Sequence, residues 1–205
     1  MAVWSDFYPG LTSSVSGCPE PMLDFALRKA AAEFFRRTRA WTIWLAPVTT
    51  LALTRDYALT LPAGSDVVRI ERAAINGSVI EILGYRDLQL DPSLHAPGEN
   101  GVTTLDRKLI TLGMDYPAGS SLEIQVALMP SKAALGITDV QFDHYSDDIA
   151  QGAKARLMLM PGQPFSNPNL GVLAKELFEH AVATKNVDSW RSHTANTPAA
   201  RVRWC

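Results

Sequence analysis

The stretch Ile149–Phe178, IAQGAKARLMLMPGQPFSNPNLGVLAKELF, decides how the second half of the chain folds. Small and apolar residues run up to a Pro-Gly pair at 161–162, which ends the helical pattern. Asn167 then supplies a helix N-cap and Pro168 a first-turn proline, so a second helix begins at once. The stretch therefore predicts two helices joined by a rigid corner.

This corner carries no nucleophile and base pair, no cluster of metal ligands and no phosphate-binding loop. It does carry three prolines, each of which fixes a backbone angle at low entropic cost. A rigid corner that follows a run of small helical residues suits close, repeated contacts between subunits. We therefore expect a subunit-packing elbow, made of Pro161, Gly162, Pro164, Asn167 and Pro168.

Three helices are expected where apolar residues recur at spacings of three and four. The first runs from about 20 to 40, and the second runs from Asp139 to Met160, with Asp139 or Asp143 as its cap. The third runs from 168 to 190. Its expected core stripe consists of Leu170, Leu173, Leu177, Phe178 and Ala181.

Between 49 and 129 the apolar pattern changes to a period of two, which is typical of β-strands. Asn76-Gly77 lies between two such runs and predicts a hairpin, because its type I′ turn needs positive φ at both central positions. A second hairpin is expected at LDRKL, 105–109. The block therefore indicates an antiparallel β domain.

Together these elements predict an α+β fold: a helical bundle of three or more helices with an inserted antiparallel β domain and an extended C-terminal arm. The bundle is expected over 1–48 and 137–191, the β domain over 49–130 and the arm over 192–205. The arm has no apolar period, but its end combines arginine and tryptophan, which are enriched at interfaces. Its expected partner-binding residues are Arg201, Val202, Arg203 and Trp204.

Composition excludes some classes of protein. The net charge of -2 gives no general attraction to nucleic acid or to an acidic membrane. Two cysteines are too few for a disulfide scaffold and match no metal motif, which favours a reducing compartment. The N-terminus has no signal-peptide pattern, and no apolar run approaches the ~20 residues of a membrane span. A soluble, cytoplasmic protein is expected.

The sequence contains no motif with a catalytic mechanism, so we expect no enzyme and no cofactor. One alternative is a metal site at His144 with Asp147 and Asp148, although acidic residues near a helix start explain the same pattern. Glu176 and His180, four residues apart, are expected to be a solvated pair rather than an acid–base couple. A ligand-binding pocket in the β domain is the other alternative.

The end of the first helix carries Arg36, Arg37 and Arg39. Cations at a helix C-terminus suit the helix dipole, which is one explanation. The other explanation is a basic surface that faces a channel carrying DNA, which would need no sequence readout.

The order of these parts resembles the head-to-tail adaptor proteins (connector or head-completion proteins) of tailed bacteriophages, including the tail tubular type of short-tailed phages. The resemblance is carried by WSDFYP at 4–9, ALRKAAAEFFRRTRAW at 26–41, IAQGAKARLMLMPGQPFSNPNL at 149–170 and the last helix at 170–190. It implies a ring, in that family usually twelve-fold, which docks under the portal after DNA packaging. It also implies a C-terminal arm that reaches toward the portal.

The function that this resemblance implies is that of a virion structural protein in the neck, assembled in the host cytoplasm. Its ring would extend the DNA ejection channel, let DNA pass without sequence-specific binding, and offer a platform to the next neck, tail or nozzle protein. A tail-completion or tail-terminator ring is the nearest alternative. A metal-dependent enzyme or a ligand-binding protein is the more distant one.

Overall fold

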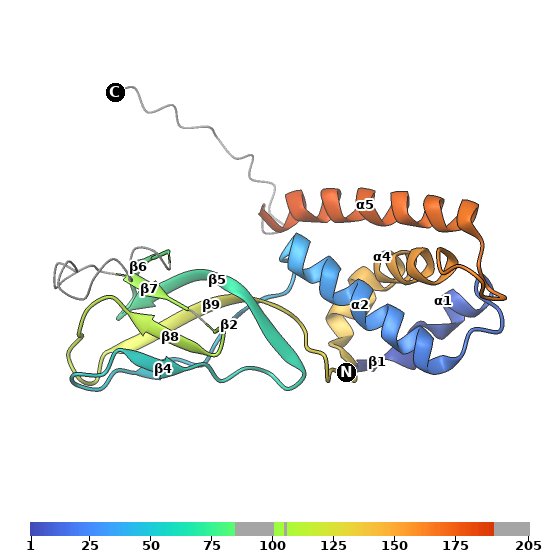
Figure 1. The fold of residues 1–205 in the computed structure, drawn as a ribbon. Helices are drawn as coiled ribbons and strands as arrows, with labels where there is room; N and C mark the ends of the chain where they lie inside the picture. Colours follow the sequence, from blue (N-terminus) through green and yellow to red (C-terminus); the bar gives the residue numbers. More distant parts are fainter. Residues whose placement is uncertain (85–100, 105, 191–205) are drawn as a thin grey trace, which may run out of the picture. The chain divides into compact units, whose positions relative to one another are not determined.

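The computed structural model describes residues 1–84, 101–104 and 106–190 (Figure 1). The chain divides into two compact units. The helical unit combines Met1–Ala40 with Gly136–Cys205, and the sheet unit is Trp41–Leu135. The unit borders therefore lie at 40–41 and 135–136, compared with the expected borders at 48–49 and 130–137. None of the described helices is long and apolar enough to cross a bilayer.

The helical unit begins with a strand that the sequence did not indicate. This strand, β1, pairs antiparallel with β10, so Ala2 lies opposite Ile137 and Val3 opposite Gly136. Between and after them come one short 3-10 helix and four α-helices in the described part of the unit. The elements are β1 (Ala2–Val3), η1 (Trp4–Phe7), α1 (Tyr8–Thr12), α2 (Glu20–Thr38), β10 (Gly136–Ile137), α4 (Asp139–Met158) and α5 (Pro168–Trp190).

Aromatic side chains from three helices form the centre of the helical unit. Phe34 and Phe35 on α2 are fully buried, with ring centroids 5.2 Å and 5.8 Å from the ring of Tyr145 on α4. Phe178 on α5 lies 6.3 Å from Phe34. Such contacts orient the helices as well as removing apolar surface from water. α2 ends at Thr38, and the next residue, Arg39, has a left-handed backbone (φ 55°) and donates its N–H to the Phe35 carbonyl at 2.9 Å.

The N-terminus of α4 is capped differently from the expectation. Thr138 is the N-cap, and its hydroxyl oxygen accepts a hydrogen bond from the N–H of Gln141. The Gln141 side chain accepts from the N–H of Thr138 at 3.1 Å, which completes a capping box. The expected caps, Asp139 and Asp143, lie inside the helix instead.

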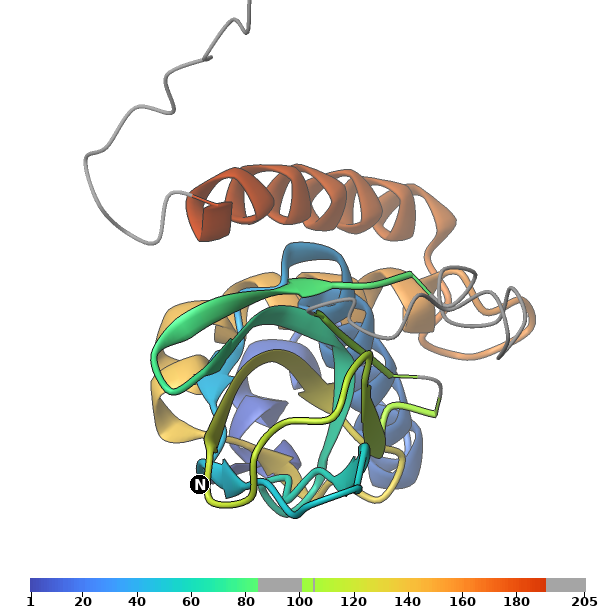
Figure 2. The ribbon, with the colours of Figure 1, turned by 90° about the vertical axis from the view of Figure 1, so that its left-hand side faces the viewer.

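The sheet unit is one eight-stranded sheet, in the order β2-β9-β5-β6-β7-β8-β4, with β3 also paired to β9. β5 and β9 are its longest strands, and two irregularities in their pairing bend the sheet. Figure 2 shows it curled into a half-barrel. The strands are β2 (Thr42–Trp44), β3 (Val48–Thr49), β4 (Asp56–Ala58), β5 (Ser65–Ile75), β6 (Ser78–Ile82), β7 (Gly101–Thr103), β8 (Leu109–Leu112) and β9 (Ser121–Pro130).

Both expected hairpins are confirmed. Asn76 and Gly77 have φ of 49° and 78°, and they join β5 to β6 with Ile75 opposite Ser78. The second hairpin joins β7 to β8, and its turn contains Arg107 with φ of 64°.

The predicted fold class is wrong. The chain is a mixed α/β protein with a curled half-barrel sheet, not a helical bundle that carries a small antiparallel insert. Two features caused the error. The alternating runs around Val67 and Val126 belong to long, bent strands with a buried side of their own, so they build an independent core. In addition, β6 and β7 pair in parallel, which a pattern of antiparallel hairpins does not indicate.

Candidate interaction surfaces of the helical unit

The elbow is a closed corner between α4 and α5. The carbonyl of Met158, at the end of α4, accepts hydrogen bonds from the N–H of Asn167 at 3.0 Å and from the hydroxyl of Ser166 at 3.2 Å. Asn167 also caps α5, because its Oδ1 accepts from the N–H of Leu170 at 3.3 Å. Phe165 is buried, and Gly162 supplies a left-handed turn with φ of 73°. These contacts confirm the predicted cap and hold the two helices in one arrangement.

The prolines of the elbow do not belong to this packed interior. Pro161, Pro164 and Pro168 are all exposed, as are Gly162 and Asn167. The elbow is therefore rigid on its inside and presents its predicted subunit-packing residues on its outside.

Glycines let the three long helices approach closely. A Cβ placed on Gly152 of α4 would lie 2.7 Å from ring carbons of Phe178 and 3.0 Å from Cβ of Ala30. A Cβ on Gly171 of α5 would lie 2.9 Å from Cγ of Leu159. α2, α4 and α5 therefore touch where only glycine leaves room, and α5 is held against α4 along much of its length.

The side of α5 that faces this core was predicted only in part: Phe178 is buried as expected, but the three leucines of the expected stripe are not. Its buried residues are Gly171, Ala174, Phe178 and Val182, which follow one another at spacings of three and four. The leucines assigned to the core stripe, Leu170, Leu173 and Leu177, are instead exposed. The sequence was misleading here because leucines are large and apolar, and such residues at helical spacing usually form the buried side of a helix. The glycine–alanine–phenylalanine–valine spacing would have identified the inner side, because small residues allow helices to pack closely.

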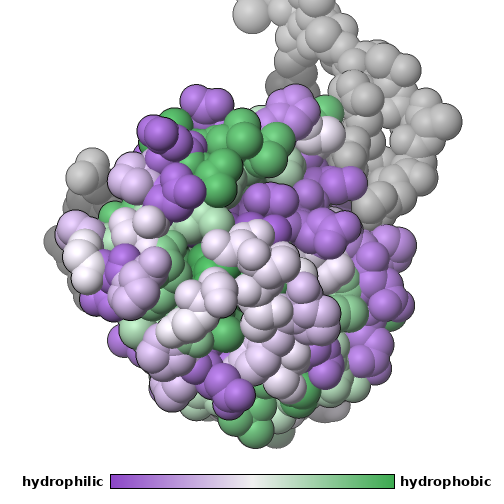
Figure 3. Space-filling view, turned by 90° about the vertical axis from the view of Figure 1, so that its right-hand side faces the viewer, coloured by the Kyte–Doolittle hydropathy of each residue, from purple (hydrophilic) through white to green (hydrophobic). Residues whose placement is uncertain are grey.

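The outer face of α5 is consequently apolar, and its side chains are exposed in the described part of the chain. Five of its aliphatic side chains keep between 47% and 50% of their surface exposed, namely Leu170, Val172, Leu173, Leu177 and Val187. In Figure 3, which faces the elbow end of the molecule, an apolar patch lies at the top, where Figure 1 places the start of α5. A helix that is apolar on both sides is normally buried, and clustered apolar exposure marks interaction sites.

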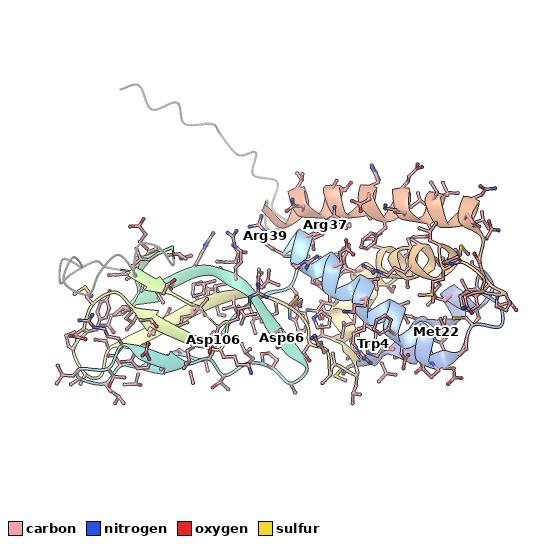
Figure 4. The ribbon with its side chains drawn as sticks, in the orientation of Figure 1. Trp4, Met22, Arg37, Arg39, Asp66 and Asp106 are labelled. Atoms are coloured by element: carbon pink, nitrogen blue, oxygen red, sulfur yellow. The ribbon has the colours of Figure 1, made fainter. Side chains whose placement is uncertain are left out.

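The arginines expected to face a DNA channel have three different environments. Arg37 binds Glu179 of α5 through two hydrogen bonds, at 3.0 Å and 2.6 Å, and also contacts Glu33. These hydrogen bonds, which Arg37 donates, lower the pKa of the Glu179 carboxyl and raise the pKa of the Arg37 guanidinium. Arg39 forms the helix end described above, and Arg36 is exposed. Figure 4 shows Arg37 and Arg39 at the end of α2.

Glu33 links this network to α4, since Arg156 also bonds to its carboxylate. Arg37 is therefore neutralised and clamps α2 to α5, so the three arginines do not form one continuous basic surface. The charge that remains on the outer face of α2 comes from Arg36 together with a lysine nearer the start of the helix. Lys29 and Arg36 are exposed there, and Lys29 Nζ lies 5.6 Å from the ring centroid of Phe25.

The alternative metal site lacks a ligand set. His144 and Asp147 are exposed, whereas Asp148 is partly buried, which raises the pKa of its carboxyl against the opposing effect of Lys185. Across the described residues, no group of three or more His, Cys, Asp or Glu side chains could hold a metal ion. Glu176 and His180 are both exposed on α5.

The sheet unit has an open hollow of about 650 Å³ between β4, β5 and the turn before β8. Asp66, Asp106, Arg107 and Lys108 contribute charged groups to its lining, and Figure 4 labels the two aspartates. The Asp106 carboxylate, however, accepts hydrogen bonds from the N–H groups of Lys108 and Leu109, which lower its pKa. It therefore serves to fix its own turn.

The predicted residues of the C-terminal arm, Arg201, Val202, Arg203 and Trp204, lie outside the described residues.

No protein-family model and no curated protein matches the chain.

Proposed function

We propose that this chain is a structural subunit of a ring in the neck of a tailed bacteriophage, a head-to-tail adaptor that docks on the portal. The observation that supports the proposal from the structure is the uncovered apolar outer face of α5. The adaptor assignment itself comes from the resemblance in the order of the chain's parts.

The physical argument starts from the cost of exposing that face. Fully burying a leucine or valine side chain contributes about 1.5–3 kcal/mol of hydrophobic free energy. Burying the exposed halves of these five side chains would therefore contribute on the order of 5 kcal/mol more than an isolated chain gains. A partner that covers them recovers this free energy. The elbow and the ion pairs of Arg37 keep α5 in place before the partner arrives, so little conformational entropy is lost on binding.

In this proposal the chain performs no chemistry and needs no cofactor. Its partners are further copies of itself, about twelve in a ring by the resemblance, together with the portal and the next neck, tail or nozzle protein. DNA passes through the ring without sequence-specific contacts. The arm at 192–205, with Arg201, Val202, Arg203 and Trp204, reaches the portal, and the elbow residues lie at contacts between subunits.

Negative-stain electron microscopy of the purified protein, alone and mixed with its cognate portal, tests this function. We expect rings, and we expect rings stacked on the portal in the mixture. A variant that lacks 192–205 should fold and form rings but fail to attach. If the truncated protein attaches to portal-bearing capsids at wild-type occupancy, the arm is not the element that binds the portal. Binding to isolated tail tubes but not to the portal would favour a tail-completion or terminator ring instead.

A further inference from the structure

A ring of identical subunits needs two different surfaces that fit each other, because each copy contacts its neighbours head to tail. The outer face of α5 is one candidate surface. The second must lie elsewhere on the same copy, on an exposed face that complements α5 in shape and charge.

The outer face of α2 has the required properties. Phe25 keeps 54% of its surface exposed, an unusual exposure for so large an apolar side chain. One cation contacts it and a second follows on the same face: Lys29 lies over its ring, and Arg36 is exposed about three turns further along the helix. Arg28 lies beside them, and its Nε is buried without a hydrogen-bond partner in the described part of the chain.

The charges of the two faces are complementary. Glu33, the acid within the same stretch of α2, is already bound by Arg37 and Arg156 on the inner side. The α2 face is therefore net positive. On α5, Glu176 lies among the exposed leucines and forms no ion pair with another described residue. Glu176 can therefore pair with the exposed cations of α2, because Glu33 is already bound to other arginines.

The spacing of the two faces also agrees. Phe25, Lys29, Ala32 and Arg36 follow one another at intervals of four, three and four, and so do Leu173, Leu177, His180 and Thr184. Matching intervals allow two helices to pack along several turns, with side chains of one between those of the other. Both helices are long enough for this, at 19 and 23 residues.

We propose that the outer face of α5 in one copy packs against the outer face of α2 in a second copy, so that Phe25 lies among the exposed leucines and Glu176 faces the cations of α2. This inference rests on the proposed ring and names the surfaces that join its neighbouring copies. Pairing of α5 with α5 would instead leave Phe25 and its cations without a counterpart.

Disulfide cross-linking in the full chain separates these arrangements. In a background with Cys18→Ser and Cys205→Ser, we combine Phe25→Cys with Leu173→Cys in one chain and oxidise it. Head-to-tail packing predicts a ladder of dimers, trimers and larger species, whereas each single variant stays monomeric on a non-reducing gel. A dimer from Leu173→Cys alone would show α5 against α5 and overturn the proposal.

A charge exchange supplies the second measurement and its control. We expect Glu176→Lys, and separately Lys29→Glu, to raise the protein concentration for half-maximal assembly by about three- to tenfold. The double variant should return to within about twofold of the wild type. Lys175→Gln, at an exposed neighbouring position, is the control and should change little, because it removes a charge without placing a like charge beside Glu179.

The outcomes distinguish this interface from the proposed function. Wild-type assembly that is intact in mass photometry, but without the ladder or the charge rescue, overturns the interface and leaves the ring. A wild-type protein that stays monomeric at all concentrations, alone and with portal, overturns both.

Discussion

Replacing Gly152 by alanine should destabilise the helical unit, although the same change in most helices is stabilising. Alanine gains about 1 kcal/mol over glycine in a helix interior. Here, however, the new Cβ would lie 2.7 Å from ring carbons of Phe178 and 3.0 Å from Cβ of Ala30. Phe178 is itself held by Phe34, so the ring has little room to move. Overpacking costs about 1–3 kcal/mol, and at the upper end of that range the net loss is about 2 kcal/mol.

Urea unfolding followed by circular dichroism at the helix band measures this loss, because the long helices all belong to the helical unit. Gly10→Ala is the matched control, since a Cβ there has no neighbour within 4 Å, and its midpoint should rise slightly. Combining Gly152→Ala with Phe178→Leu should restore part of the loss, which a double-mutant cycle would detect. A Gly152→Ala midpoint that rises as the Gly10→Ala midpoint does would refute the close contact of α2, α4 and α5.

Three further predictions concern the same unit. Thr138→Ala removes the capping box of α4 and should lower the free energy of unfolding by about 1 kcal/mol, measured by urea unfolding, whereas Asp143→Ala should change it little. Burial and the hydrogen bond to Asp24 raise the pKa of Tyr8 to about 12, from an ordinary value of 10.0. The folded state disfavours the Tyr8 phenolate, so the protonated phenol contributes to the stability of the protein fully below pH 10. This contribution is lost as the pH rises toward 12. An ultraviolet titration in which all tyrosines ionise near pH 10 would contradict the prediction. Pro164→Gly combined with Pro168→Gly should impair ring assembly more than monomer folding, and equal losses in both would remove the architectural role of the elbow.

Local signals in the sequence were sufficient for the elements but not for their assembly. The helices, the Asn76-Gly77 hairpin and the Asn167 cap follow from spacing and backbone requirements within a few residues. The capping of α4 by Thr138 was missed because nearby aspartates are equally good candidates.

The choice of buried side on α5 depends on contacts far along the chain. Leu170, Leu173 and Leu177 look like a core stripe together with Phe178. Only Phe178 of these is buried, because Gly152 leaves room for its ring. The strand order of the sheet also depends on long-range pairing. β6 and β7 pair in parallel although a long connection separates them in the sequence. The main candidate surface is hidden in the sequence for the same reason, because an apolar stripe on a helix indicates a buried face and an interface equally well.

The apolar outer face of α5 is the feature on which the assembly proposal depends most directly. Mass photometry of the wild type and of Leu173→Asp with Leu177→Asp, each alone and with portal, tests it, with unchanged circular dichroism as the check on folding. Since both leucines are exposed, the variant should fold normally but remain a single copy, whereas the wild type should form particles of many copies. A variant that assembles as the wild type does would contradict the proposal.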